Sequence, residues 1–389
     1  MTSISKQKKI IILGSTGSIG KSALDIIKKS PDLFKVTGIS FHSNIKQADS
    51  QIKEFKPESV AATGIKESDF LSQNTAYKNI PLFFGTDGLK NMLQNTNADI
   101  VVNGIAGSSG FLPSFWAIEA GMDLALANKE TIVMAGPIIL HKAEEMNVNI
   151  IPVDSEHSAL FFLLKKMQKK NIKELILTAS GGAFRDFSLN DLKSVTLKDA
   201  LQHPTWNMGN KITIDSATMA NKGLEIIEAK YLFNMDISKI KVLIHPQSYV
   251  HSLIRTNDNN LYAQISYPDM RIPIKNALTF PDMIENNIQE LSLAGHSLSF
   301  MDWDNKKYPM LTLAYYAAEK GGAYPIVYNA SNEAFVNAFM NNQISFLDIH
   351  KYVNKILEFD WEIKVNSIAS ILQIDSEARK KSNEMIKNK

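Results

Sequence analysis

Residues 8–20 read KKIIILGSTGSIG, and this stretch decides the fold. The β-branched apolar run Lys8–Leu13 predicts a buried strand, and a glycine-rich turn follows it at once. The segment from about Lys21 to Lys29 then predicts a helix. A glycine motif placed between a strand and a helix is more specific for dinucleotide binding than the glycine spacing alone. We therefore expect the first βα unit of a dinucleotide-binding domain, with an ordinary glycine-rich turn as the alternative.

The glycines of this turn are spaced as GxxGxxG, at Gly14, Gly17 and Gly20. Glycine lets the backbone approach a pyrophosphate closely, and the N-terminus of the following helix supplies free N–H groups. Further strands are expected near three segments, 59–63, 98–103 and 123–127. This alternation of strands and helices predicts a doubly wound α/β domain over residues 1–153.

The second expected strand, Lys35–Phe41, ends in His42, Ser43 and Asn44. Sites that prefer NAD commonly carry an acidic residue here for the ribose hydroxyls, and this segment has none. Small polar groups suit a 2′-phosphate, so the sequence favours NADP over NAD, although the segment also lacks an arginine.

A strand near 123–127 ends in Asn128, Lys129 and Glu130. Polar residues at the carboxyl end of a parallel strand face the ligand crevice of an α/β sheet. Lys129 is therefore a candidate substrate contact, and a plain surface loop is the alternative.

Residues 149–158 read NIIPVDSEHS, an apolar run that ends in two carboxylates. If Ile150–Val153 is a strand, Asp154 and Glu156 share one face because side chains alternate along a strand. Two carboxylates at that end of a sheet would bind a hard divalent cation. The alternative is that both residues cap the next helix.

Residues 215–225 read DSATMANKGLE and open a helix expected to run to about Phe233. Glu225 lies four residues after Asn221, so the two side chains stack on one helix face beside Lys222. Glu225 could supply a third carboxylate, while Ser216, Asn221 and Lys222 could bind a phosphate near the helix start. A solvated Glu225 is the alternative.

Two loops add candidate contacts for an anionic substrate. Ser180 precedes two glycines, which suggests a hydroxyl and backbone N–H groups presented to an anion, with a plain turn as the alternative. The segment 201–209, LQHPTWNMG, concentrates His, Trp and Gly. It indicates a lid over about 187–213 in which His203 touches the substrate, and a loop packed by its own tryptophan is the alternative.

Composition narrows the classes of protein. The 389-residue chain has a formal net charge of +2, which implies no polyanionic partner such as nucleic acid. It has no cysteine, which excludes disulfides, thiolate metal sites and thiol nucleophiles. The opening residues lead into only four apolar residues, and no apolar run is long enough to span a membrane. We expect a soluble cytoplasmic protein whose segment 308–389 is helical.

Seven motifs occur in one order: GSTGSIG, ANKE, VDSEH, SGG-F, HPTWNMG, ATMANKGLE and HPQSxVH. This set resembles the 1-deoxy-D-xylulose 5-phosphate reductoisomerase family from Gly14 to about Pro273, and the helical tail fits the family's C-terminal domain. Two positions depart from the family pattern. Ala183 stands where proline is usual, and residues 41–43 lack the basic residue or extra glycine often found there.

The resemblance implies an N-terminal Rossmann-like NADPH domain (1–153), a central α/β catalytic domain with the lid (154–290), a linker (291–307) and a C-terminal helical domain (308–389). It implies isomerisation and reduction of 1-deoxy-D-xylulose 5-phosphate to 2-C-methyl-D-erythritol 4-phosphate. NADPH and a divalent cation would be required, Mn²⁺ or Mg²⁺ with Co²⁺ as a further candidate. It also implies a homodimer.

The resemblance assigns roles to residues by position. The implied metal ligands are Asp154, Glu156 and Glu225. The implied catalytic and substrate-binding residues are these three with Lys129, Ser155, Ser180, His203, Trp206, Ser216, Asn221 and Lys222. The cofactor contacts, including those expected from the glycine turn and the second strand, are Gly14, Thr16, Gly17, Ser18, Ile19, Gly20, His42, Ser43, Asn44, Asn128, Glu130, Gly209 and Met270.

Two other classes stay open on the residues alone. An ordinary NADP-dependent alcohol or semialdehyde dehydrogenase would share the N-terminal domain but would not depend on a metal. A non-enzymatic dinucleotide sensor would bind NADPH without turnover, and it gives no reason for Asp154, Glu156 and Lys222.

Overall fold

The structure is a computed structural model that describes residues 7–73, 80–206, 208–285 and 288–388. The chain forms two compact units. Unit 1 comprises Met1–Asn128, Ile139–Asp154 and Met270–Ile288, and unit 2 comprises Lys129–Ile138, Ser155–Asp269 and Gln289–Lys389. The helix α6 (Lys129–Glu145) contributes to both units and is kinked at Ala135, whose backbone is not helical.

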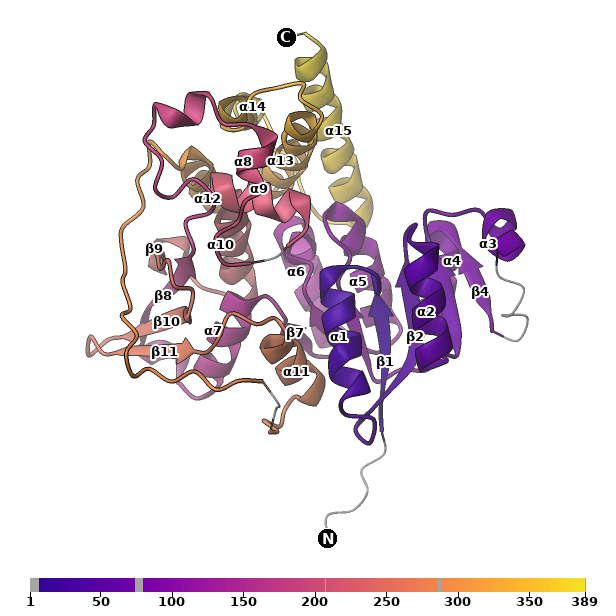
Figure 1. Cartoon of the computed structure of the whole chain (residues 1–389). Coiled ribbons are helices and arrows are strands. Elements are labelled where there is room, and N and C mark those ends of the chain that lie inside the picture. The colour runs from indigo at the N-terminus through magenta and orange to yellow at the C-terminus, as the bar shows by residue number, and fades with distance from the viewer. Residues whose placement is uncertain (1–6, 74–79, 207, 286–287, 389) are drawn as a thin grey trace. The chain divides into compact units, whose positions relative to one another are not determined.

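Unit 1 is built on a parallel seven-stranded sheet with the order β4-β3-β2-β1-β5-β6-β7. Its strands are β1 (Lys8–Leu13), β2 (Phe34–Phe41), β3 (Ser59–Ala62), β4 (Leu82–Phe84), β5 (Ile100–Asn103), β6 (Asp123–Leu126) and β7 (Ile150–Pro152). Its helices include α1 (Ser18–Lys28), α2 (Ile45–Phe55), α3 (Glu67–Gln73), α4 (Gly85–Asn95), α5 (Phe111–Glu119) and α11 (Arg271–Thr279). Figure 1 shows α1 and α2 on one face of the sheet and α4 and α5 on the other.

The sheet of unit 1 confirms the predicted doubly wound fold. Strand β1 lies at its centre, between β2 and β5, and Ile10–Leu13 are fully buried. An unbroken apolar run fits such a strand because helices cover both of its faces. Strand order reverses beside β1, and its carboxyl end leads into the glycine turn. This is the place where doubly wound sheets bind ligands.

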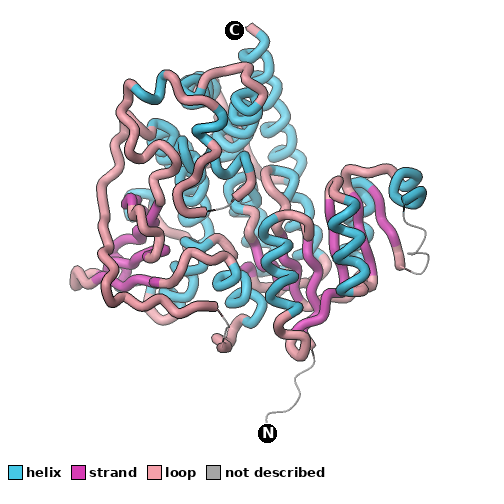
Figure 2. Tube along the Cα trace, viewed as in Figure 1, coloured by secondary structure: helices cyan, strands magenta, loops and turns pink. Residues whose placement is uncertain are grey.

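Unit 2 combines a mixed four-stranded sheet with helices (Figure 2). The sheet has the order β11-β10-β8-β9 and consists of β8 (Ile172–Ala179), β9 (Ile240–Ile244), β10 (Val250–Thr256) and β11 (Leu261–Ile265). The helices are α7 (Ser155–Lys165), α8 (Leu197–Ala200), α9 (Asn210–Thr218), α10 (Ala220–Leu232), α12 (Pro309–Lys320), α13 (Tyr324–Met340), α14 (Phe346–Leu357) and α15 (Ile368–Lys387).

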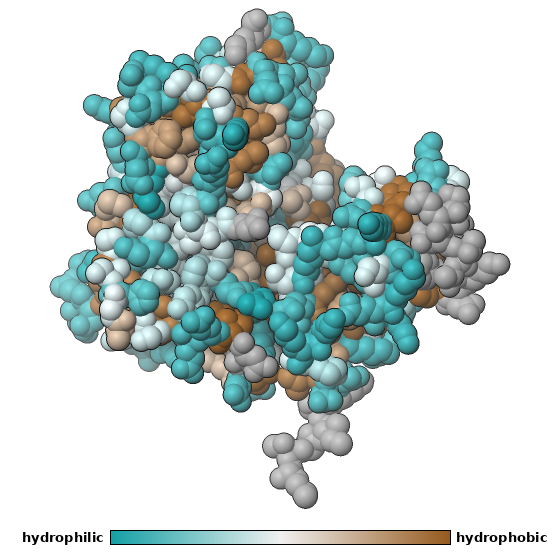
Figure 3. All heavy atoms as spheres, viewed as in Figure 1, coloured by the Kyte–Doolittle hydropathy of each residue, from teal (hydrophilic) through white to brown (hydrophobic). Residues whose placement is uncertain are grey.

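One hydrophobic core joins the sheet of unit 2 to its helices. Leu175 and Leu177 of β8 pack in the same buried cluster as Ile226 of α10 and Leu311 of α12. The predicted helical segment 308–389 belongs to the same unit as Ser155–Asp269, which is most of the predicted catalytic segment. On the face drawn in Figure 3, apolar surface also gathers over the helical part of this unit.

Three local expectations were wrong. The strand β7 ends at Pro152 and α7 begins at Ser155, so Glu156 lies in the first turn of a helix and not on a strand face. The single helix expected from Asp215 to about Phe233 is two helices, broken at Met219, which has a left-handed backbone (φ 62°). The strand β10 was missed. Among the described residues, no helix is long and apolar enough to cross a membrane.

Candidate functional site

The glycine turn of unit 1 is shaped by close backbone contacts. Gly14 has a left-handed backbone (φ +75°), and Gly17 donates its N–H to the Gly14 carbonyl over 3.0 Å. A Cβ on Gly20 would come within 2.5 Å of both the Gly14 carbonyl oxygen and the Ser15 Cα. Gly17 is the N-cap of α1 and has no side chain to cap the first N–H groups. The turn is therefore a cradle that suits a pyrophosphate.

Further predicted cofactor residues follow the carboxyl ends of other strands of the same sheet. His42 follows β2, and its Nδ1 lies 3.1 Å from Thr63 Oγ1. Asn44 caps α2 by accepting the N–H of Gln47 over 3.2 Å. Asn128 follows β6 and donates to the carbonyls of Ile105 (2.7 Å) and Gly107 (2.8 Å). The remaining predicted cofactor residues of this unit are Thr16, Ser18, Ile19, Ser43 and Met270.

A buried cluster of opposite charges lies in unit 2. Lys129 donates to Glu225 Oε1 over 3.0 Å and to Asn221 Oδ1 over 2.9 Å. Lys222 donates to Glu156 Oε1 over 2.6 Å and also to Glu225. The exposed fractions are 5% for Lys129, 3% for Lys222 and 0% for Glu225, which rules out the solvated alternative for Glu225. The geometry follows from α10, which presents residues 221, 222 and 225 on one side.

The two lysines keep the Glu156 carboxylate ionised. Burial raises the pKa of Glu156, but the ammonium groups of Lys222 and Lys129 outweigh that effect and lower the pKa to about 2. Burial lowers the pKa of Lys222, and Glu156 and Glu225 raise it by more. The Glu156 carboxylate and the Lys222 ammonium group thus hold each other charged inside the protein.

His157 and Glu228 lie against this cluster, and sequence reasoning gave neither residue a role. The His157 Nε2 lies 2.9 Å from the Glu225 backbone carbonyl, and its Nδ1 lies 3.4 Å from Glu228 Oε2. A His157 ring nitrogen is also within 4.8 Å of a carboxylate oxygen of Glu225, and Asp154, three residues before His157, reaches it within the same distance. The position of His157 directly after the two carboxylates of VDSEH is the sequence feature that could have marked it as a site residue.

The donor set fits a hard divalent cation. Carboxylate oxygens are the ligands that Mg²⁺ and Mn²⁺ prefer, and the side chains of Glu156 and Glu225 meet at one ammonium group, that of Lys222. Asp154 directly precedes α7, and Ser155 in its first turn donates to Glu156 Oε2 over 2.6 Å. Glu156 and Glu225 thus already converge on one cation, the ammonium group of Lys222.

A second group of polar side chains in unit 2 joins Ser180, His203 and Ser216. The His203 Nε2 lies 2.9 Å from Ser180 Oγ and 3.1 Å from Ser216 Oγ. The His203 Nδ1 accepts the backbone N–H groups of Thr205 (3.1 Å) and Trp206 (2.9 Å). Because Nδ1 is an acceptor, Nε2 carries the proton and points at the two hydroxyls. Such donors suit a phosphate oxygen.

The segment around His203 was predicted as a lid. Trp206 is partly buried, residue 207 lies outside the described residues, and Gly209 is the N-cap of α9. Burial, with a smaller contribution from Arg185, lowers the pKa of His203 to about 4, so the ring is neutral at physiological pH. A neutral imidazole that donates through Nε2 can bind an anion without carrying a charge of its own.

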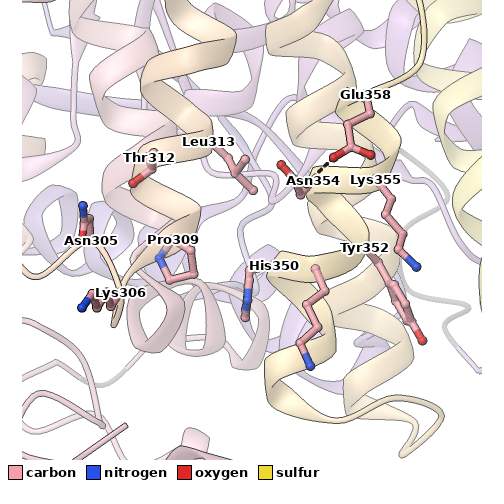
Figure 4. A pocket seen from close by; sticks show the side chains of 11 residues that line it. Asn305, Lys306, Pro309, Thr312, Leu313, His350, Tyr352, Asn354, Lys355 and Glu358 are labelled. Atoms are coloured by element: carbon pink, nitrogen blue, oxygen red, sulfur yellow. Dashed lines mark hydrogen bonds between the residues drawn. The ribbon is translucent and has the colours of Figure 1, made fainter.

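A surface cavity of about 750 Å³ lies elsewhere in unit 2, beside α12 and α14 (Figure 4). It is lined by Lys306, His350, Lys355 and Glu358 among others, and by none of the predicted site residues. Lys306 and Lys355 lie on opposite sides of it, so they do not converge on one anion (Figure 4). The cavity is not the predicted substrate site.

These features define a class of protein. A doubly wound sheet with a glycine cradle is a dinucleotide-binding fold. Buried carboxylates balanced by lysines, together with a separate group of hydroxyl and imidazole donors, fit an oxidoreductase that acts on a small anionic substrate with the help of a metal ion.

The chain belongs to the 1-deoxy-D-xylulose 5-phosphate reductoisomerase family. The family model of that description matches residues 10–136, and the models of the family's C-terminal domains match residues 150–233 and 265–381. The reductoisomerase of Crocosphaera subtropica is 45% identical over 96% of this chain and 95% of its own length. That of Macrococcus caseolyticus is 44% identical over 97% and 100%.

Solved structures agree with this assignment. A DOX-P reductoisomerase in complex with NADPH, fosmidomycin and magnesium superposes with a TM-score of 0.91 at 35% identity, covering 98% of each chain. The Zymomonas mobilis enzyme in complex with NADPH gives a TM-score of 0.89 at 36% identity, covering 98% of this chain and 99% of its own.

Proposed function

We propose that this chain converts 1-deoxy-D-xylulose 5-phosphate to 2-C-methyl-D-erythritol 4-phosphate with NADPH and a divalent cation. Membership of the family supports the reaction, and the relatives solved with NADPH and with magnesium support the cofactors. The observation that carries the proposal within this chain is the buried cluster of Glu156, Glu225, Lys129 and Lys222.

Each part of the candidate site has a proposed role. Asp154, Glu156 and Glu225 hold the cation, and the glycine turn holds the pyrophosphate of NADPH. When bound, the cation supplies Lewis-acid stabilisation of charge on substrate oxygens, and NADPH supplies the hydride. Substrate oxygens replace the carboxylates as acceptors of the Lys129 and Lys222 N–H groups.

The phosphate of the substrate binds among Ser180, His203, Ser216, Asn221 and Lys222 in this proposal. The His203 Nε2 and the two serine hydroxyls already face one another, so little reorganisation is needed. Trp206 follows in the lid, which excludes water when it closes. Binding energy from the remote phosphate can thus stabilise the closed, reactive state.

The change Glu225→Gln tests the metal role. We expect it to lower turnover by about 100-fold or more, since it removes one anionic ligand, while NADPH affinity stays nearly unchanged. Turnover is followed as NADPH oxidation at 340 nm with 1-deoxy-D-xylulose 5-phosphate, after chelation and after Mn²⁺ is restored. Glu377→Gln, an exposed carboxylate of α15, is the control. Wild-type activity of Glu225→Gln at saturating Mn²⁺ would exclude this role.

We also infer that the enzyme is a homodimer. The strand β11 supports this, because it is an edge strand of its sheet and its Leu261 and Ile265 are exposed by 49% and 38%. Exposed apolar edge strands are ready surfaces for pairing with another chain. A cytoplasmic location stays a prediction from the sequence.

A further inference from the structure

Lys211, which had no predicted role, lies at the centre of a second charged cluster in unit 2. It is in the first turn of α9, two residues after Gly209. Its Nζ lies 2.8 Å from Glu130 Oε1, 3.0 Å from Asp215 Oδ2 and 3.9 Å from Glu333 Oε1. These three carboxylates come from α6, α9 and α13, so one ammonium group joins three helices.

The cluster continues to the C-terminal helix. Glu333 Oε2 accepts from Arg379 of α15 over 2.6 Å, and Arg379 also donates to Asp375 over 2.8 Å. Asn332 donates to Asp215 Oδ1 over 2.8 Å. Residues 329–333, NASNE, lie in the middle of α13, where the buried Asn332 contacts Asp215 and Glu333 contacts Lys211.

Lys211 stays charged in this setting. Burial lowers its pKa, but Asp215, Glu130 and Glu333 together raise it above the usual value. Burial raises the pKa of Glu130, and Lys211 lowers it by more. Removing Lys211 would take the shared ammonium group away from the buried carboxylates of Glu130 and Asp215.

The neighbours of Glu130 make this arrangement relevant to the reaction. Glu130 is a cofactor contact by resemblance, and Lys129 beside it donates to Glu225 and Asn221. A shift of the first turn of α6 would therefore displace both side chains. Lys211 fixes that turn from one side, and it fixes the end of the predicted lid through α9.

We propose that Lys211 is a positioning residue that holds Glu130 for NADPH and anchors the C-terminal end of the lid. The proposal rests on the proposed function, since it takes Glu130 as a cofactor contact. Lys211 acts through Glu130, and the ion-pair partners that the described residues offer it are Glu130, Asp215 and Glu333.

The test compares Lys211→Met with Arg379→Met, which damages the same cluster at its far end. Affinity for NADPH is measured by fluorescence titration without metal or substrate, and the melting temperature is measured for each variant. We expect Lys211→Met to weaken NADPH binding about 10-fold or more. We expect Arg379→Met to lower the melting temperature while leaving NADPH affinity within about twofold of wild type. Lys211→Arg should restore most of the affinity, because it keeps the charge.

The double variant Lys211→Met with Glu130→Gln keeps the test informative if Lys211→Met does not fold. It removes both charges, so no buried anion is left at position 130. If Lys211 acts through Glu130, the double variant binds NADPH as Glu130→Gln does, and the two effects are not additive. A double variant that binds NADPH more weakly than Glu130→Gln, or equal NADPH affinity in Lys211→Met and wild type, would overturn the proposal. A wild-type protein that binds NADPH without turnover would instead refute the proposed function.

Discussion

His203 is the site residue whose protonation state the geometry fixes. Its Nδ1 accepts two backbone N–H groups, and burial lowers its pKa to about 4. In the unfolded chain the same ring has a pKa near 6.5. Between pH 6.5 and 4 the unfolded state therefore binds a proton that the folded state excludes, so the folded state loses stability as the pH falls through this window.

We predict that His203→Gln removes this pH dependence. The difference in unfolding free energy between wild type and His203→Gln should be constant above about pH 6.5, and it should shift against wild type by about 1–2 kcal/mol between pH 6.5 and 4, an estimate discounted because the ring is only partly buried. Urea unfolding at several pH values measures it. A difference that stays the same from pH 7 to 4 would show that His203 is not shielded as described.

At the candidate site, contacts within one helix could be predicted from the sequence, and contacts between helices could not. Asn221, Lys222 and Glu225 lie on one side of α10, as their spacing predicted. Lys129 lies 92 positions before Asn221 and reaches it from another helix. His157 and Lys211 were not predicted, because their roles depend on helices that are distant in sequence. Lys211 meets Glu130, which is 81 positions earlier, and no local pattern marks such a partner.

At the scale of elements, strands buried on both faces by apolar residues were easy to predict, and breaks set by packing were not. Met219 ends α9 in a left-handed conformation that methionine rarely adopts, yet its side chain is 2% exposed within the core of unit 2. Tertiary packing imposes that turn. The strand β10, VHSLIRT, lacks alternation because its polar residues His251 and Ser252 are buried as well.

The turn after β1 gives a prediction at this scale. Gly20→Ala should raise the KM for NADPH by about 10-fold or more and lower the melting temperature, because its Cβ would meet two backbone atoms at 2.5 Å and force the cradle open. Gly17→Ala is the matched variant, since its Cβ would meet only the Gly14 carbonyl at 3.2 Å. Initial rates at varied NADPH measure both. Equal effects of the two changes would contradict this account of the turn.

At the scale of the molecule, the α/β N-terminal part and the helical C-terminal part were predictable from the sequence. The partition into compact units was not. The segment Met270–Ile288 returns to unit 1 after the sheet of unit 2 is complete, and Lys129–Ile138 belongs to unit 2 although it follows the strands of unit 1. Such crossings arise from packing between segments that are far apart in sequence. Hydrophobic periodicity describes one segment at a time and carries no information about them.

The edge strand β11 gives a prediction for the assembly. Strand β11 pairs only with β10 within its sheet, and Leu261 and Ile265, four residues apart, point to the same face. Two copies related by a twofold axis would present the same edge to each other, which satisfies the rule that such interfaces are self-complementary. We expect a particle of twice the chain mass of 43.4 kDa in analytical ultracentrifugation.

Replacing Leu261 and Ile265 together by lysine should shift that particle to the mass of one chain, because charges on an edge strand oppose pairing. The control Leu372→Lys changes a similarly exposed leucine of α15 and should leave the dimer intact. Circular dichroism should be the same for all three proteins, since none of the changed side chains is buried. A double-lysine variant that remains dimeric would place the interface away from β11, and a monomeric wild type would refute the dimer itself.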